Sequence, residues 1–163
     1  MALASPITAD AIPHFAQRFE TAQPQEIVRW AIDTFGDGVS VGASFGGASG
    51  MAILHMAASI KPDVHVFVLD TDYLFEETHE TMRRAAVSLD LQNLQVYKSR
   101  LTHEQQALQH GSALWMRDPD ACCELRKVEP NRRALDGKTA CLSGLRRDQS
   151  EGARHQESRR VGS

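Results

Sequence analysis

The segment Val64-His65-Val66-Phe67-Val68-Leu69, followed directly by Asp70-Thr71-Asp72, decides the fold of this chain. A continuous apolar run of this length is typical of a strand that is buried on both faces of a parallel sheet. Three further β-rich segments lie at residues 39–43, 94–97 and 139–143. We expect helices around them, at residues 7–18, 24–35, 51–60, 75–89, 102–111 and 120–135, with Pro130 as a kink or break in the last one. This alternation predicts an α/β fold with an open, mainly parallel twisted sheet and helices on both of its faces.

The composition is that of an ordinary globular protein, with 163 residues of which 42% are hydrophobic and 24% charged. We expect residues 1–150 to form a single domain and residues 151–163 to form a disordered tail. A net charge of -3 gives no nucleic-acid signature, and no apolar run reaches the ~18 residues that a membrane span needs. The N-terminus lacks a signal-peptide pattern, and the odd number of cysteines, three, argues against a secreted disulfide scaffold. These features predict a cytoplasmic protein that binds neither nucleic acid nor membranes.

Polar loops follow three of the expected strands, at the edge where ligands bind in open α/β sheets. The small residues of Ser44–Gly50 let the backbone approach an anion at a helix N-terminus, although a plain tight turn explains them equally well. The loop at residues 69–73 carries carboxylates, for which a helix cap is the alternative. In the loop at residues 144–150, Arg146 and Arg147 suit a phosphate or sulfate, and the alternative is a solvated loop. Together these loops predict a site for a nucleotide-like anion.

The pair Cys122-Cys123 is the most unusual feature of the sequence. Adjacent cysteines are poor disulfide partners, but neighbouring thiolates can bind one metal or inorganic cluster. Arg126 and Lys127 follow closely, and positive charge favours the thiolate form. The alternative is a pair of buried small hydrophobic side chains beside a solvated Arg-Lys pair. The third cysteine, Cys141, falls in an expected strand, and we interpret it as a buried small hydrophobic residue.

Four motifs between about residue 15 and residue 150 carry a family resemblance. They are Ser44-Phe45-Gly46-Gly47, Leu69-Asp70-Thr71, Arg117-Asp118-Pro119 with Cys122-Cys123-x-x-Arg126-Lys127-Val128-x-Pro130, and Gly144-Leu145-Arg146-Arg147-Asp148-Gln149-Ser150. In these motifs the chain resembles the assimilatory adenylyl-sulfate and phosphoadenylyl-sulfate reductases, which have an adenine nucleotide α-hydrolase-like fold. The cysteine pair is typical of the cluster-containing branch, whose usual substrate is adenylyl sulfate.

The resemblance implies a role for each motif. The phosphosulfate loop would contain Ser44, Gly46 and Gly47; the adenosine would be held by Leu69, Asp70 and Thr71; and an arginine loop over the nucleotide would contain Gly144, Arg146 and Arg147. By the same resemblance Cys122 and Cys123 are two of four ligands of a [4Fe-4S] cluster, and Lys127 lies near cluster and substrate. In the family a C-terminal cysteine attacks the sulfur of the substrate, and thioredoxin or glutaredoxin then releases sulfite. Homo-oligomers are common in the family.

This sequence also departs from the family pattern. The family has a second cysteine pair, spaced C-x-x-C, and a C-terminal Glu-Cys-Gly-x-His tail with the nucleophile, and the 163 residues contain neither. The segment Ala48-Ser49-Gly50 lacks the usual acidic residue, and residues 151–163 read like trimmed or out-of-frame sequence. We therefore expect this chain by itself to bind no stable [4Fe-4S] cluster and to catalyse no reduction.

Two other functions fit parts of the sequence. An ATP pyrophosphatase, or a sulfate adenylyltransferase small subunit, shares the fold, but it favours a Ser-Gly-Gly-x-Asp-Ser loop and has no reason to carry Cys122-Cys123. A non-catalytic nucleotide-binding remnant of a reductase is the other alternative. Iron and sulfide analysis of anaerobically purified protein would separate these hypotheses.

Overall fold

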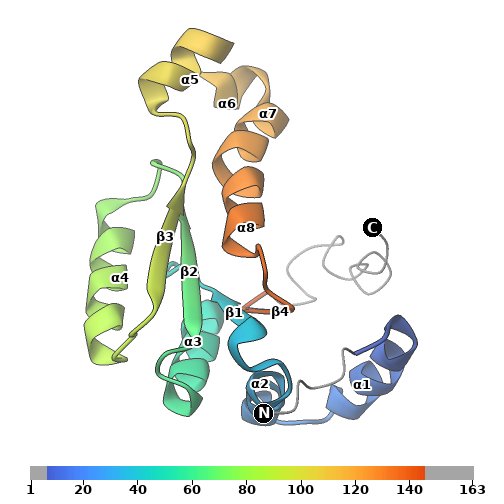
Figure 1. Ribbon diagram of the computed structural model, residues 1–163. Helices are drawn as coiled ribbons and strands as arrows, with labels where there is room; N and C mark the ends of the chain where they lie inside the picture. The colour runs from blue at the N-terminus through green and yellow to red at the C-terminus, as the bar shows by residue number, and fades with distance from the viewer. Residues whose placement is uncertain (1–6, 146–163) are drawn as a thin grey trace.

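The computed structural model describes residues 7–145, and its centre is a four-stranded parallel sheet (Figure 1). The strands are β1 (Val39–Gly42), β2 (His65–Asp70), β3 (Leu94–Lys98) and β4 (Ala140–Ser143). Their order in the sheet is β3-β2-β1-β4, and every pair of neighbours is parallel. All four carboxyl ends therefore lie at one edge of the sheet, and the predicted open parallel α/β fold is confirmed.

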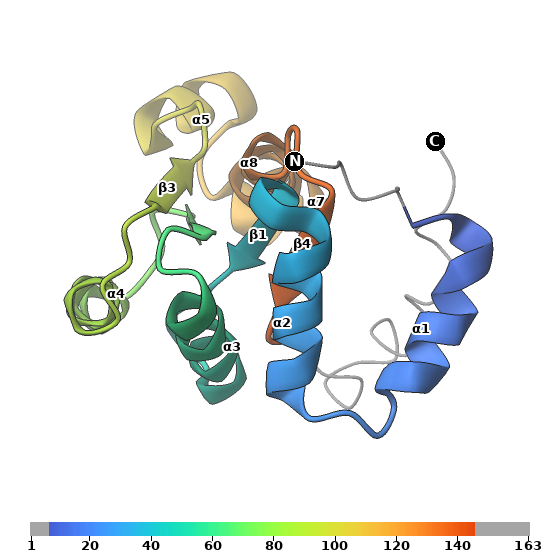
Figure 2. The same cartoon turned by 60° about the horizontal axis from the view of Figure 1, so that its bottom comes forward.

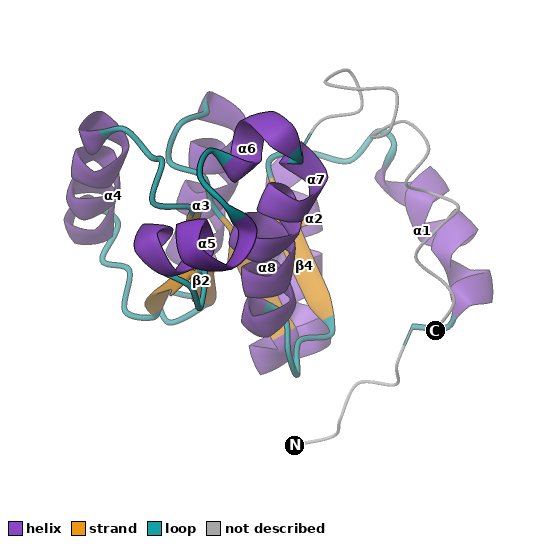
Figure 3. Ribbon diagram, turned by 90° about the horizontal axis from the view of Figure 1, so that it is seen from above, coloured by secondary structure: helices purple, strands orange, loops and turns teal. Residues whose placement is uncertain are grey.

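Helices cover both faces of this sheet (Figure 2). On one face lie α2 (Pro24–Phe35), α3 (Ala48–Ile60) and α4 (Glu76–Ser88), and on the other lies a rod made of α7 (Pro119–Cys123), a π-helical turn (Glu124–Val128) and α8 (Glu129–Ala134). The short helices α5 (His103–His110) and α6 (Leu114–Arg117) precede this rod (Figure 3). The first helix, α1 (Ile12–Phe19), packs on α2 through Phe15 and Phe19, whose ring centroids lie 4.9 and 4.7 Å from that of Trp30. In the described part of the chain no helix is long and apolar enough to cross a bilayer.

The apolar run at residues 64–69 forms the middle of the core, as predicted. Val64, Val66 and Val68 are almost completely buried, because helices cover β2 on both sides. By contrast β3 and β4 lie at the edges of the described sheet, and their residues are at most half-buried. The interpretation of Cys141 as a buried residue was therefore wrong: its side chain is exposed on the edge strand β4.

Two helix boundaries differ from the predictions. Helix α3 begins at Ala48, so Ala48-Ser49-Gly50 form its first turn and do not continue the loop. The predicted helix over residues 120–135 runs on as one rod, and Pro130 lies in the first turn of α8. A proline ring would collide with the carbonyl four residues earlier in a regular helix. The π-helical turn avoids this, because there the Glu129 N–H bonds to the carbonyl of Glu124, five residues earlier.

A buried histidine in β2 gives the fold a predicted pH dependence. His65 is 6% exposed, and its Nδ1 shares a hydrogen bond of 2.7 Å with Ser40 Oγ. Burial lowers the pKa of His65 below its ordinary value of 6.5, and the charge of Lys138 lowers it further. At a pH between the lowered pKa of the folded chain and the ordinary pKa of the unfolded chain, the imidazole is protonated in the unfolded chain and neutral in the folded one. The free energy of unfolding should therefore fall as the pH drops below 6.5.

We expect His65→Gln to flatten this pH dependence, which for one proton amounts to at most about 1.4 kcal/mol per pH unit. Urea unfolding between pH 5 and pH 7.5 measures it. His14→Gln, at an exposed position in α1, is the matched control. An equal slope in the His65→Gln and wild-type proteins would contradict the assignment.

Candidate functional site

Two adjoining cavities lie at the carboxyl edge of the sheet. The smaller, of about 410 Å³, lies over the ends of β1 and β4 and is lined by residues that include Ser44, Asn131, Cys141 and Ser143. The larger, of about 750 Å³, lies between the loop after β2 and the α7 rod. It is lined by residues that include Thr71, Cys122, Cys123, Arg126 and Lys127. Leu69 and Leu74 line both cavities, and six of the twelve predicted site residues line one or both of them.

The loop after β1 has the geometry of an anion cradle. Phe45 has a φ of 55°, an unfavourable backbone for a bulky residue, and the burial of its ring in the core holds it there. A Cβ added at Gly47 would meet no atom within 4 Å, and one at Gly46 only the Ser44 carbonyl oxygen at 3.9 Å. The backbone of Gly46 and Gly47 therefore borders open space, and it leads into α3, whose N-terminus has no side-chain cap. Uncapped N–H groups at a helix N-terminus are a favourable environment for an anion.

The loop after β4 packs directly on this cradle. Ser49 Oγ donates a hydrogen bond of 2.8 Å to the carbonyl oxygen of Gly144. A Cβ at position 144 would lie 2.4 Å from the nitrogen and 2.7 Å from the Cα of Gly50. Only glycine at position 144 allows the two backbones to approach so closely. The predicted loops at residues 44–50 and 144–150 are therefore in contact through Gly144. Arg146 and Arg147 lie outside the described residues.

The loop after β2 is held by its own carboxylates. Asp70 is buried; its Oδ1 accepts a hydrogen bond of 2.9 Å from the Asp72 N–H, and its Oδ2 lies 2.9 Å from Lys98 Nζ. Thr71 Oγ1 accepts a bond of 3.3 Å from the N–H of Tyr73. Phe75 is the N-cap residue of α4 and makes no side-chain cap bond, so neither Thr71 nor Asp72 caps that helix. The helix-cap alternative for this loop was wrong, and Thr71 lines the larger cavity.

The segment Cys122–Lys127, here called the thiol segment, follows a helix start that its sequence favours, an aspartate before a proline. Asp118 is the N-cap residue of α7, and its side chain accepts a hydrogen bond of 2.9 Å from the N–H of Ala121. This start places Cys122, which is buried, and Cys123, which is half-buried, on the wall of the larger cavity. Lys127, one turn later, is exposed on the same wall, and no residue in the range 7–145 forms an ion pair with it.

These residues fit only half of a [4Fe-4S] cluster. Two adjacent thiols beside a cavity suit two of its ligand positions, but such a cluster needs four protein ligands. Cys141 belongs to β4 and lines the other cavity. Within residues 7–145 no three His, Cys, Asp or Glu side chains are grouped so that they could hold a metal ion. The described residues alone thus do not fit the complete cluster.

Arg126 is the residue whose role the sequence did not reveal. It is 1% exposed, and it connects the thiol segment to the loop after β2. Its Nε donates to Gln106 Oε1 at 2.8 Å, and one terminal nitrogen donates to the Thr71 carbonyl at 3.2 Å and to Asp72 Oδ2 at 2.7 Å. One sequence feature could have indicated that Arg126 is buried: it lies one helical turn after Cys122, and therefore on the same side of the rod.

Comparisons with known proteins find relatives of this chain. The sequence family described as the phosphoadenosine phosphosulfate reductase domain matches residues 39–161. The adenosine 5'-phosphosulfate reductase of Salinibacter ruber is 43% identical over 148 residues, which are 91% of this chain and 58% of that protein. The reductase of the same name from Geobacillus thermodenitrificans is 39% identical over 145 residues, 89% of this chain and 61% of that protein.

A solved structure is similar over most of the chain. The crystal structure of phosphoadenylyl-sulfate reductase from Candida auris, in a phosphate complex, has a TM-score of 0.75 and 31% sequence identity. The similarity covers 87% of this chain and 70% of that one. The chain spans 58% and 61% of the length of the two bacterial relatives.

Proposed function

Because the chain belongs to the phosphoadenosine phosphosulfate reductase family, we propose that it forms the nucleotide-binding part of an enzyme that reduces adenylyl sulfate to sulfite. One observation carries the proposal. A cavity beside the Ser44–Gly47 cradle adjoins a second cavity that contains both thiols, and Leu69 and Leu74 line both. A ligand that spans the two cavities can place an adenosine phosphate in the first and its sulfur next to the second. The family match leaves no reason to prefer an ATP pyrophosphatase.

Adenylyl sulfate is preferred over phosphoadenylyl sulfate for two reasons. The bacterial relatives are named for adenosine 5'-phosphosulfate, and the Cys122-Cys123 pair is typical of the branch that uses it.

The proposed roles follow the cavities. The phosphosulfate group lies on the backbone of Ser44, Gly46 and Gly47, where N–H groups at the start of α3 favour negative charge. Leu69, Asp70 and Thr71 border the nucleotide; Asp70 acts by shaping the loop, because its carboxylate is already paired with Lys98. Gly144 borders the cradle from the end of β4. By the family resemblance, Arg146 and Arg147 are proposed to bind the nucleotide.

The remaining roles concern electron transfer and assembly. Cys122 and Cys123 are proposed as two of the four ligands of a [4Fe-4S] cluster, and thioredoxin or glutaredoxin as the electron donor. Lys127 supplies positive charge near the substrate sulfate, where its ammonium group is free of ion pairs within residues 7–145. A cytoplasmic location and a homo-oligomeric assembly are part of the same proposal.

Titration calorimetry with adenylyl sulfate and adenosine 5'-phosphate tests the nucleotide site. We expect the 163-residue chain to bind both weakly. Ser44→Ala removes a hydroxyl that lines the smaller cavity and should lower the affinity about tenfold to a hundredfold, the cost of one hydrogen bond to a charged group. The matched control is Ser59→Ala at the other end of α3, where the hydroxyl donates only to the carbonyl of His55. An absence of binding at millimolar ligand would remove the support for this function.

A further inference from the structure

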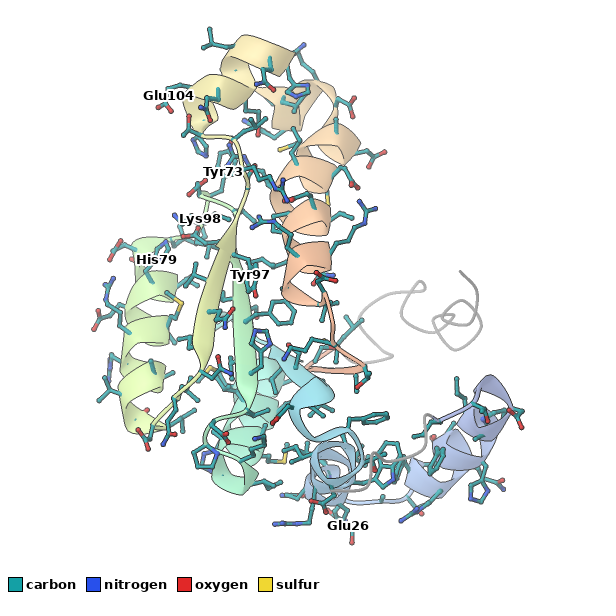
Figure 4. The ribbon with its side chains drawn as sticks, viewed as in Figure 1. Glu26, Tyr73, His79, Tyr97, Lys98 and Glu104 are labelled. Carbon is teal, nitrogen blue, oxygen red and sulfur yellow. The ribbon has the colours of Figure 1, made fainter. Side chains whose placement is uncertain are left out.

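An ion-pair network joins the ends of β2 and β3 to the thiol segment. Asp72 uses both of its carboxylate oxygens: Oδ1 lies 2.8 Å from Lys98 Nζ, and Oδ2 lies 2.7 Å from a terminal nitrogen of Arg126. Lys98 also reaches Asp70 Oδ2 at 2.9 Å. Lys98 and Tyr73 lie at the end of β2 and β3 that faces α5 (Figure 4). Among residues 7–145, Asp72 is thus the one that forms ion pairs with both Lys98 of β3 and Arg126 of the thiol segment.

The ion pair is buried on its Arg126 side, whereas the Asp72 side chain is 28% exposed. The Arg126 side chain is 2% exposed, and the Tyr73 ring lies over its guanidinium, 5.5 Å from centroid to carbon. Asp72 is its one carboxylate partner among the described residues. The second terminal nitrogen of Arg126 is buried and has no hydrogen-bond partner there. A buried guanidinium is costly without a counter-charge, so Asp72 both neutralises Arg126 and fixes its orientation beside the larger cavity.

The backbone of Asp72 is adapted to this contact. Its φ of 60° is in the left-handed region, which is unfavourable for most residues but tolerated by aspartate and asparagine. Burial raises the pKa of Asp72, but the bonds from Lys98 and Arg126 outweigh burial and hold that pKa below its ordinary value. The carboxylate is therefore charged at neutral pH, and the ion pairs keep the turn in place.

We propose that Asp72 is a positioning residue: through Arg126 and Lys98 it holds the loop at residues 69–73 and the segment Cys122–Lys127 at one fixed separation. Each of these segments lines the larger cavity. The inference rests on the proposed function, because that cavity is where the sulfate end of the substrate is placed. Asp72 itself does not line either cavity and is not expected to touch the substrate.

Positioning and simple electrostatics predict opposite effects of Asp72→Asn. Loss of a negative charge beside Arg126 makes the site more cationic, which by itself would tighten the binding of an anion. Asparagine keeps the left-handed turn, but it replaces one of the two carboxylate oxygens with an NH2 donor. Since Lys98 and Arg126 contact different oxygens of Asp72, the variant cannot keep both contacts. If Asp72 positions the two segments, the variant should bind adenylyl sulfate about tenfold more weakly, and neutral adenosine about as well as the wild type.

Hydrogen exchange followed by mass spectrometry tests, without any nucleotide, whether Asp72 holds the two segments together. We expect about tenfold faster exchange at residues 70–75 and 124–128 in Asp72→Asn, with no change in β1 or α3. The control is Asp63→Asn, which breaks an ion pair of 3.0 Å with Lys61 just before the start of β2. A general loss of stability would instead accelerate exchange throughout the chain.

The outcomes separate the two proposals. If exchange rises in both segments and adenylyl sulfate binding weakens, Asp72 is a positioning residue. Unchanged or tighter binding by Asp72→Asn, or faster exchange in only one segment, overturns the inference while leaving the proposed function intact. If the wild-type chain binds no nucleotide, the proposed function fails, and the exchange pattern alone then decides whether Asp72 joins the two segments.

Discussion

Replacing Gly144 with alanine is expected to destabilise the protein and to disrupt its nucleotide site together. The added Cβ would lie 2.4 Å from the backbone nitrogen of Gly50, too close for any real contact. Neither backbone can give way easily, because β4 is fixed by its ladder with β1 and Gly50 lies in the first turn of α3. We expect a loss of about 1–3 kcal/mol, typical of overpacked sites, and at least about tenfold weaker binding of adenosine 5'-phosphate.

Urea unfolding and calorimetry measure the two effects of Gly144→Ala. The matched control is Gly46→Ala in the cradle, where the nearest atom to the new Cβ lies 3.9 Å away. That control should keep the wild-type stability, since nothing in the fold occupies the space. A Gly144→Ala protein as stable as the Gly46→Ala protein would show that the loop after β4 does not pack on α3.

The sheet was predictable because its central strand has an unambiguous pattern. Only a strand covered on both faces needs the continuous apolar run at residues 64–69, and the helix-strand alternation around it then requires parallel crossovers. The edge strands carry a weaker signal. The Cys141 interpretation was wrong because the sequence of β4 alone does not tell which of its sides is covered, and that depends on the order β3-β2-β1-β4.

The positions of the loops were predictable, but their contacts were not. Strand ends place polar residues near one edge, which is why Ser44, Thr71 and the thiols gather around two adjoining cavities. The Ser49–Gly144 contact joins residues 95 positions apart, and no local pattern encodes it. From the sequence alone Arg126 resembles an ordinary exposed cation, because the partners that accompany its burial, Asp72 and Gln106, come from two other segments.

Lys127→Ala is expected to have the largest effect on turnover of any substitution considered. Measuring this effect requires an active enzyme. We would obtain one by joining residues 1–145 of this chain to the remaining C-terminal part of the Salinibacter ruber relative. We expect this fusion to release sulfite from adenylyl sulfate with thioredoxin. The 163-residue chain should release none, because two of its three cysteines are proposed cluster ligands and Cys141 lies on β4.

In the fusion, Lys127→Ala should reduce the rate of sulfite release by about 10²–10³, the usual cost of removing one preorganised charge from a reaction site. Nucleotide affinity should change much less, because the cradle and the Gly144 loop remain intact. Lys138→Ala is the matched control, since that ammonium group donates to the Asp37 carbonyl, in the turn before β1 and away from the carboxyl edge. Equal losses in rate and affinity would mean that Lys127 only binds the ground state. Sulfite release by the 163-residue chain, abolished by Cys141→Ala, would instead make Cys141 the nucleophile and move the reaction into the smaller cavity, which that thiol lines.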